Sequence, residues 1–151
     1  MAIVYLLLGT NLGDRNANLG QAKCLLEKEF GPAQGASQTV ETLSIGFDGP
    51  AFLNRVEAYR TRRSARTVLE RCKQIERQMG RSETPQYRSD GSRIYHSRII
   101  DIDILEYRLA SDPGRSVQIN TPALRVPHPQ VEGRPFVRPL LDAAIKQTIK
   151  H

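Results

Sequence analysis

The sequence of 151 residues contains no tryptophan, only two cysteines and few aromatic residues, which make up 6% of the chain. Cys24 and Cys72 lack the spacing of a metal-binding motif, and each falls within an apolar helical pattern. We therefore expect two reduced thiols in the core, as suits a cytoplasmic protein.

Long hydrophobic runs are also missing. The apolar run from Ala2 to Leu8 is too short to span a bilayer, lacks a basic leader and leads directly into a turn rich in glycine. We interpret it as a first strand, and we expect no membrane partner. Internal repeats and low-complexity tracts are absent too, so residues 1–151 are predicted to form a single domain.

Acidic residues are fewer than basic ones: the chain has 16 Asp and Glu and 22 Lys and Arg, which gives a net charge of +6. A basic protein of this kind favours anionic partners. Nucleic acid, an acidic surface and a polyphosphate substrate all meet that description, and charge does not choose among them.

Two carboxylates stand inside an isoleucine-rich stretch, Arg98-Ile-Ile-Asp-Ile-Asp-Ile-Leu105, which has strand composition. A period of two places Asp101 and Asp103 on one face and the isoleucines at 100, 102 and 104 on the other. Neighbouring anions repel unless a cation joins them, and magnesium prefers carboxylate oxygens. Because the motif is short, a metal site and an ordinary acidic strand face both remain open.

The rest of the chain gives a strand and helix order. Strands are predicted around residues 3–8, 36–43, 52–59 and 99–105, and helices around 15–30, 65–79 and 140–145. Asn11 or Asp14 caps the first helix and Ser64 the second. Residues 82–97 are polar and lack periodicity, so we expect a long loop that acts as a lid or binding segment.

Three polar side chains are notable for their setting. Asn54 lies among apolar neighbours and offers a donor and an acceptor to a planar heterocycle, although backbone capping is the more common role of an Asn. Glu76 falls on the margin of the apolar stripe of its helix, and we expect it to be partly enclosed. His128, held between two prolines near several arginines, favours a phosphate contact over a structural role.

Several segments together resemble the 6-hydroxymethyl-7,8-dihydropterin pyrophosphokinase family of folate biosynthesis. They run in order from Tyr5 to about Leu140. The segments are residues 9–13, 52–54, 76 with 80–81, 98–105, 126–129 and 134–137. The combination of Arg-x-x-Asp-x-Asp with a downstream Pro-His and Arg-x-Phe is specific, whereas each piece alone is not.

The resemblance implies an α+β fold, a ferredoxin-like α/β sandwich with a mainly antiparallel sheet and flanking helices, which agrees with the predicted order of elements. It implies transfer of pyrophosphate from ATP to the hydroxymethyl group of the reduced pterin, with release of AMP. Asp101 and Asp103 would be the metal ligands and bind two Mg²⁺ ions that bridge the ATP phosphates. Positioning and charge neutralisation dominate such chemistry.

The same matching assigns the other site residues. The pterin site would consist of Thr42, Ile45, Phe52, Asn54 and Phe136, with the two phenylalanines sandwiching the ring. The catalytic residues would be Arg81, Arg98, Asp101 and Asp103. The ATP site would include Glu76, Arg98, Ile104, His128 and Arg134. Residues 82–97 match a lid that closes over both substrates.

The chain departs from the family pattern at several positions. Tyr95 stands near the place of a family tryptophan, and either Arg88 or Arg93 supplies a second lid arginine; the sequence leaves this choice open. Arg125 and Pro129 stand where family members commonly have a threonine and an aromatic residue beside His128, and the sequence leaves open whether they alter nucleotide binding.

The sequence also bears on two alternatives to an active enzyme. A non-catalytic, basic, ferredoxin-like module that binds nucleotide or RNA would need exposed aromatic residues alternating on a strand, and no strand carries that pattern. A catalytically dead relative is disfavoured by the presence of both aspartates, Arg98 and His128. We therefore expect a cytoplasmic monomer that binds ATP and a reduced pterin and has no nucleic-acid partner.

Overall fold

The computed structural model describes residues 1–43, 49–80, 86–87, 89–90, 93–94 and 99–149. In chain order the elements are β1 (Ala2–Thr10), α1 (Arg15–Phe30), β2 (Gly35–Ala36), β3 (Val40–Thr42), β4 (Phe52–Thr61), α2 (Ala65–Gln78), β5 (Gln86–Tyr87), β6 (Arg93–Ile94), β7 (Asp101–Leu109), β8 (Ile119–Asn120), β9 (Arg125–Val126), α3 (Gln130–Gly133) and α4 (Val137–Ile149).

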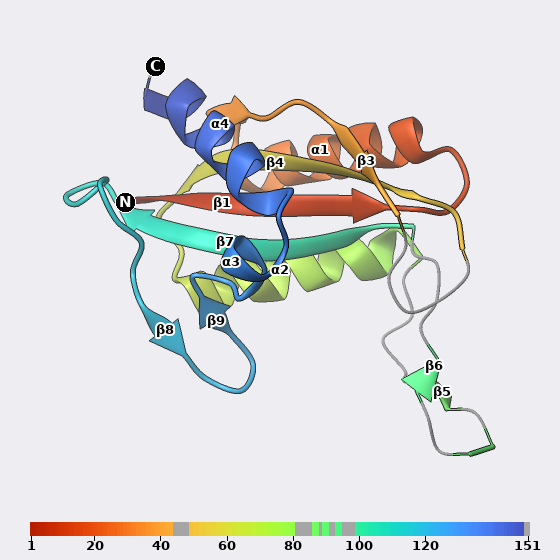
Figure 1. Cartoon of the computed structure of the whole chain (residues 1–151). Coiled ribbons are helices and arrows are strands. Elements are labelled where there is room, and N and C mark those ends of the chain that lie inside the picture. Colours follow the sequence, from red (N-terminus) through yellow and green to blue (C-terminus); the bar gives the residue numbers. More distant parts are fainter. Residues whose placement is uncertain (44–48, 81–85, 88, 91–92, 95–98, 150–151) are drawn as a thin grey trace.

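The main sheet has the strand order β2-β4-β1-β7, and β3 also pairs with β4 (Figure 1). Every pairing in this sheet is antiparallel. β1 lies in the centre, and its continuous apolar sequence fits that place because both of its faces are covered. The fold is therefore α+β with a mainly antiparallel sheet and flanking helices, as the sequence predicts.

Helices cover both faces of the sheet (Figure 1). On one face α1 and α2 pack their apolar stripes, which include Leu26 and Val68, against Leu6 and Leu8 of β1. On the other face α4 packs Leu141 and Ala144 against Leu7 and Val56. Of the described helices, α3 and α4 cover the second face only over part of its length, and the end that they leave uncovered carries the pocket described below.

The two long helices begin with side-chain caps. Asp14 Oδ1 accepts a hydrogen bond from Ala17 N at 3.0 Å, and Ser64 Oγ accepts one from Thr67 N at 3.2 Å. The cap of α1 is thus Asp14, while the buried Asn11 donates instead from Nδ2 to Pro50 O at 3.1 Å.

A β-bulge in β7 decides which of its side chains share a face. Tyr5 of β1 pairs with Glu106, but the next residue, Leu6, pairs with Ile104, so Leu105 is an extra residue on β7. Ile102 and Ile104 pack in the core under α1 and α2, and Leu105 packs on the opposite side, under α4. The prediction that the isoleucines and the aspartates occupy opposite faces is confirmed.

Some sequence-based expectations differ from the structure. The strand expected at 36–43 is divided into β2 and β3, because one extra residue interrupts pairing with β4 and the Ser37 hydroxyl accepts the hydrogen bond of Val56 N at 2.9 Å. The helix expected around 140–145 extends over the whole of α4. Within the loop expected at 82–97, β5 pairs with β6.

The expectation of two core thiols was wrong for one of them. Cys72 is buried, but Cys24 is exposed. At 100° per residue, Cys24 lies on the side of α1 opposite Ala22 and Leu26, which face the sheet. The apolar pattern around Cys24 is therefore not part of the buried stripe.

After β7 the chain forms a small ribbon of β8 and β9 and then the short helix α3. The Val126-Pro127 peptide bond is cis.

Across the described part of the chain, no helix has both the length and the apolar character that a membrane span requires.

Candidate active site

A row of paired residues crosses three strands at the uncovered end of the sheet. Gly9 of β1 pairs with Asn54 of β4 on one side and with Asp101 of β7 on the other. Paired residues point to the same face, so a glycine in the middle leaves a hollow between the amide and the carboxylate. A Cβ at Gly9 would lie only 3.3 Å from Asn54 Oδ1, which shows how closely the amide approaches the backbone there.

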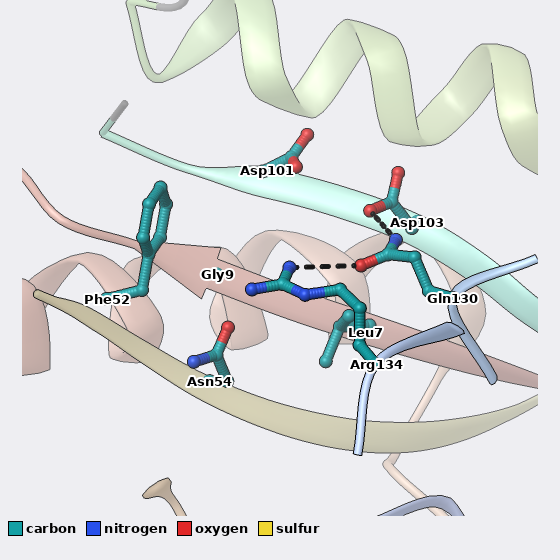
Figure 2. Close-up of a pocket in the computed structure, with 8 residues that line it drawn as sticks. All are labelled: Leu7, Gly9, Phe52, Asn54, Asp101, Asp103, Gln130 and Arg134. Atoms are coloured by element: carbon teal, nitrogen blue, oxygen red, sulfur yellow. Dashed lines mark hydrogen bonds between the residues drawn. The ribbon is translucent and has the colours of Figure 1, made fainter. Parts of the chain in front are cut away.

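The hollow is a pocket enclosed by side chains from four elements and the segment after α3 (Figure 2). Phe52 and Asn54 come from β4, the two aspartates from β7, and Gln130 begins α3. Arg134 reaches across the pocket from the α3–α4 connection (Figure 2). The full lining consists of Leu7, Gly9, Phe52, Asn54, Asp101, Asp103, Gln130 and Arg134.

The two aspartates are half-buried and lie next to each other on the pocket face of β7. Among the described residues, no group of three or more His, Cys, Asp or Glu side chains is placed to hold a metal ion. The carboxylates of Asp101 and Asp103 alone do not provide the ligands of a zinc site or of a calcium site made entirely of protein groups. They fit magnesium, which is bound by one or two carboxylates together with substrate phosphates and water.

Gln130, which the sequence did not single out, joins the acidic and basic sides of the pocket. Its Nε2 donates to Asp103 Oδ2 at 2.8 Å, and its Oε1 accepts from Arg134 Nη1 at 3.3 Å (Figure 2). A lone Gln after a His-Pro pair has no distinctive sequence signal, and only its position at the start of α3 brings it here.

Arg134 is half-buried and stacks on Phe136, with its Cζ 4.5 Å from the ring centroid. Burial lowers the pKa of the guanidinium, while the carboxylates of Asp103 and Asp101 oppose that shift. Because an arginine stays protonated in proteins, the pocket contains a fixed positive charge facing two acids.

His128 is half-buried beside this cluster. Its backbone N donates to Leu105 O at 2.8 Å, and its Nδ1 accepts from Gln130 N at 3.1 Å. Burial lowers the pKa of the imidazole, and nearby Asp101 partly opposes this. A neutral imidazole that accepts at Nδ1 carries its proton on Nε2, so Nε2 is the donor available to a ligand.

Glu76 and Ile104 lie on the other side of β7 from the aspartates. Glu76 is 3% exposed, more deeply buried than the sequence suggested, and its Oε2 accepts from Ile102 N at 2.7 Å. The Ile104 side chain is buried in the core. Since β7 is an edge strand, any nucleotide contact at Ile104 falls to its backbone rather than to its side chain.

Some of the residues that the family resemblance assigns to the pterin site lie close together in the structure. Asn54 Nδ2 donates to Thr42 Oγ1 at 2.8 Å, so β3 and β4 fix the orientation of the amide, and Phe52 lines the pocket beside it. Phe136 is half-buried and lies against the core of α4. Ile45, Arg81, Arg98 and the lid residues Arg88 and Tyr95 lie outside the described residues, as does the side chain of Arg93.

Arg15 contacts residues at both ends of the segment that connects β3 to β4. Its Nη1 lies 2.8 Å from Ala51 O and 2.8 Å from Glu41 Oε2. No sequence signal indicates this role, because Arg15 is simply the first residue of α1. It places the β1–α1 turn against the strands that carry Thr42 and Phe52.

Residues 5–145 match the family model described as 7,8-dihydro-6-hydroxymethylpterin-pyrophosphokinase. The chain is 41% identical over 146 residues to the 2-amino-4-hydroxy-6-hydroxymethyldihydropteridine pyrophosphokinase of Porphyromonas gingivalis, covering 95% of this chain and 92% of that protein.

Two further relatives are more distant. The protein of the same name from Aquifex aeolicus is 37% identical over 144 residues, which cover 94% of this chain and 80% of that protein. The mitochondrial folate synthesis bifunctional protein of Pisum sativum is 34% identical over 141 residues, covering 92% of this chain but 24% of the longer protein. The chain belongs to the 7,8-dihydro-6-hydroxymethylpterin-pyrophosphokinase family, whose members are transferases of folate biosynthesis.

Proposed function

We propose that this chain transfers pyrophosphate from ATP to 6-hydroxymethyl-7,8-dihydropterin and releases AMP and the pterin diphosphate. The observation that supports this most directly is the Asn54–Gly9–Asp101 row. In this row the Asn54 amide, which can hydrogen bond to a heterocycle, and the Asp101 carboxylate, which can bind metal, lie on opposite sides of one hollow. The reacting hydroxymethyl group of the pterin would lie between them.

The pterin lies on the β4 side of the pocket. Phe52 stacks on the ring, since aromatic faces pair in offset arrangements, and Asn54 hydrogen bonds to the ring edge. Thr42 fixes the amide through its hydroxyl oxygen, at 2.8 Å from Asn54 Nδ2. Phe136 completes the sandwich once Arg134 leaves its ring face, and the family resemblance assigns Ile45 to the same site.

Asp101 and Asp103 hold two Mg²⁺ ions together with the ATP phosphates. When bound, magnesium neutralises phosphate charge and orients the attacking and leaving oxygens. The chain itself supplies the two carboxylates on a rigid strand, and β7 is fixed by its full pairing with β1. Positioning of this kind is the main contribution of a protein to phosphoryl transfer.

The phosphates lie against His128 and Arg134. His128 donates from Nε2, because Nδ1 already accepts from Gln130 N, and Arg134 adds a positive charge. The outer edge of β7 near Ile104 and the region of Glu76 form the nucleotide side of the site. Arg81 and Arg98, assigned by the family resemblance, complete the phosphate contacts, with the lid from 82–97 excluding water.

A non-catalytic nucleotide- or RNA-binding module is not favoured, because the match covers the enzyme family model from residue 5 to residue 145. The expectations of a single domain, a monomeric state, a cytoplasmic location and no nucleic-acid partner stay predictions.

The reaction is tested by incubating the protein with ATP, Mg²⁺ and 6-hydroxymethyl-7,8-dihydropterin and separating the products by anion-exchange chromatography. Equal amounts of AMP and pterin diphosphate are expected. ADP in place of AMP, or no consumption of either substrate, would overturn the proposal. A reaction without pterin controls for simple ATP hydrolysis.

A further inference from the structure

We propose that Gln130 is a positioning residue that separates the Arg134 guanidinium from the Asp103 carboxylate and so prevents a direct ion pair between two groups that ATP and magnesium would bind. This role rests on the proposed function. Gln130 touches the acid through Nε2 at 2.8 Å and the base through Oε1 at 3.3 Å. It therefore stands between two opposite charges that line the same pocket (Figure 2).

A neutral amide suits this place because it offers a donor and an acceptor at once. The carboxylate accepts from its NH₂ group, and the guanidinium donates to its carbonyl oxygen. Turning the amide over would set its oxygen against Asp103 and its nitrogen against Arg134, two repulsive contacts. The two charged neighbours thus fix the orientation of the Gln130 side chain.

Without a spacer, the two charges would pair directly. Arginine and carboxylate form strong bidentate pairs, and a half-buried site strengthens the attraction. A direct pair would occupy carboxylate oxygens that magnesium requires and guanidinium protons that phosphate requires. Bridging through an amide occupies one carboxylate oxygen and one guanidinium nitrogen, fewer than a bidentate ion pair takes, and an amide is also easier than an ion pair to displace when ligands bind.

The backbone holds Gln130 where this bridge forms. Gln130 N donates to His128 Nδ1, and Arg134 N donates to Gln130 O at 3.0 Å, so hydrogen bonds at the start and the end of the single turn of α3 link the three residues. Val131, next in sequence, is 3% exposed and packs in the core under α4. The core therefore anchors the turn, and the side chain of Gln130 projects into the pocket.

The test measures Mn²⁺ binding by electron paramagnetic resonance, with α,β-methylene-ATP present and pterin absent, so that it does not depend on turnover. Gln130→Met keeps the side-chain volume and removes both hydrogen bonds; Gln21→Met, at an exposed position of α1, is the matched control. An ion pair between Arg134 and Asp103 would have to break before the metal binds, and we expect about tenfold weaker Mn²⁺ binding for Gln130→Met. No change is expected for Gln21→Met.

The spacer role is separated from a simple structural role by a double variant. If Arg134 captures Asp103 when the amide is lost, Gln130→Met/Arg134→Met will bind Mn²⁺ as tightly as Arg134→Met alone. The proposal is wrong if Gln130→Met binds Mn²⁺ like the unaltered protein, or if the double variant loses as much affinity relative to Arg134→Met as the single variant loses. Failure of the unaltered protein to form AMP would contradict the proposed reaction, whereas the ratio of Mn²⁺ affinities still decides the role of Gln130.

Discussion

Glu76 on α2 accepts a hydrogen bond at 2.7 Å from the backbone N–H of Ile102, the residue between the two aspartates of β7. Because β7 is the edge strand of the sheet, a backbone N–H on its outer side has no strand partner. The buried carboxylate of Glu76 satisfies that donor from the helix side, so α2 supports the strand segment that carries both acids.

Glu76→Ala is expected to destabilise the protein. The substitution leaves the Ile102 N–H buried without this acceptor, and an unsatisfied buried donor costs roughly 1–3 kcal/mol. Glu76→Gln keeps an oxygen acceptor and is expected to lose less. Urea unfolding measures both. Glu70→Ala, on an exposed position of the same helix, should change stability by less than about 0.5 kcal/mol, and a larger loss for Gln than for Ala would contradict this account.

Asp101→Asn and Asp103→Asn should each lower turnover by orders of magnitude without unfolding the protein. Each removes a metal-binding negative charge from the pocket, and each also relieves repulsion between neighbouring carboxylates in the absence of metal. AMP formation and thermal unfolding are measured in parallel. Asp112→Asn, at an exposed turn where Asp112 pairs with Arg115, is the control. Near-normal turnover in either pocket variant would exclude that residue as a metal ligand.

The pKa of His128 in the metal-free folded protein is expected to lie below its ordinary value of 6.5, since burial disfavours the charged imidazole. Below pH 6.5 the unfolded chain then binds more protons than the folded one. His128 therefore contributes full stability above pH 6.5, and the contribution falls as the pH drops towards the folded pKa.

NMR titration of the imidazole resonances measures this pKa directly, with His96→Gln and His151→Gln simplifying the assignment among the three histidines. Unfolding free energies of the unaltered protein and His128→Gln should converge as the pH falls below 6.5. A His128 pKa at or above 6.5 would contradict this prediction, because it would show that the negative charge of Asp101 affects the pKa more than burial does.

Gly35→Ala should disturb the contact between α4 and β2. The added Cβ would lie 2.6 Å from Thr148 Oγ1 and 2.9 Å from Ala144 O, distances at which α4 must move. Such overpacking typically costs about 1–3 kcal/mol. Gly20→Ala meets nothing within 4 Å in the middle of α1 and should stabilise the protein by about 0.5–1 kcal/mol. Calorimetry distinguishes the two, and equal melting temperatures would contradict the contact argument.

One thiol per native chain should react quickly with Ellman's reagent. Cys24 is exposed, whereas Cys72 is buried, and burial raises the pKa of the Cys72 thiol. In denaturant both should react. Cys24→Ser is expected to abolish the rapid phase, and rapid labelling of Cys72 in the folded state would show that α2 opens readily.

Much of the fold follows from local patterns. The apolar run of β1 predicts a central strand, and Asp14 and Ser64 cap helices whose buried stripes recur at helical spacing. The alternation at 100–104 places the acids on one face. The division of the 36–43 strand was not predictable, because it depends on the Ser37 hydroxyl, rather than a backbone carbonyl of its own segment, accepting the hydrogen bond of Val56 N on β4. Cys24 shows the converse error, since apolar neighbours did not reveal which side of α1 is buried.

Local sequence patterns are enough to identify the chemical groups of the site: two acids on one strand face, an Asn among apolar residues, a His held between prolines, and family motifs around them. How these groups meet depends on the folded chain. Strand register sets Asn54, Gly9 and Asp101 in one row, and the fold of α3 brings Gln130 between Asp103 and Arg134. Such contacts join residues far apart in the chain, so their geometry depends on packing of the whole sheet and its helices rather than on any local pattern.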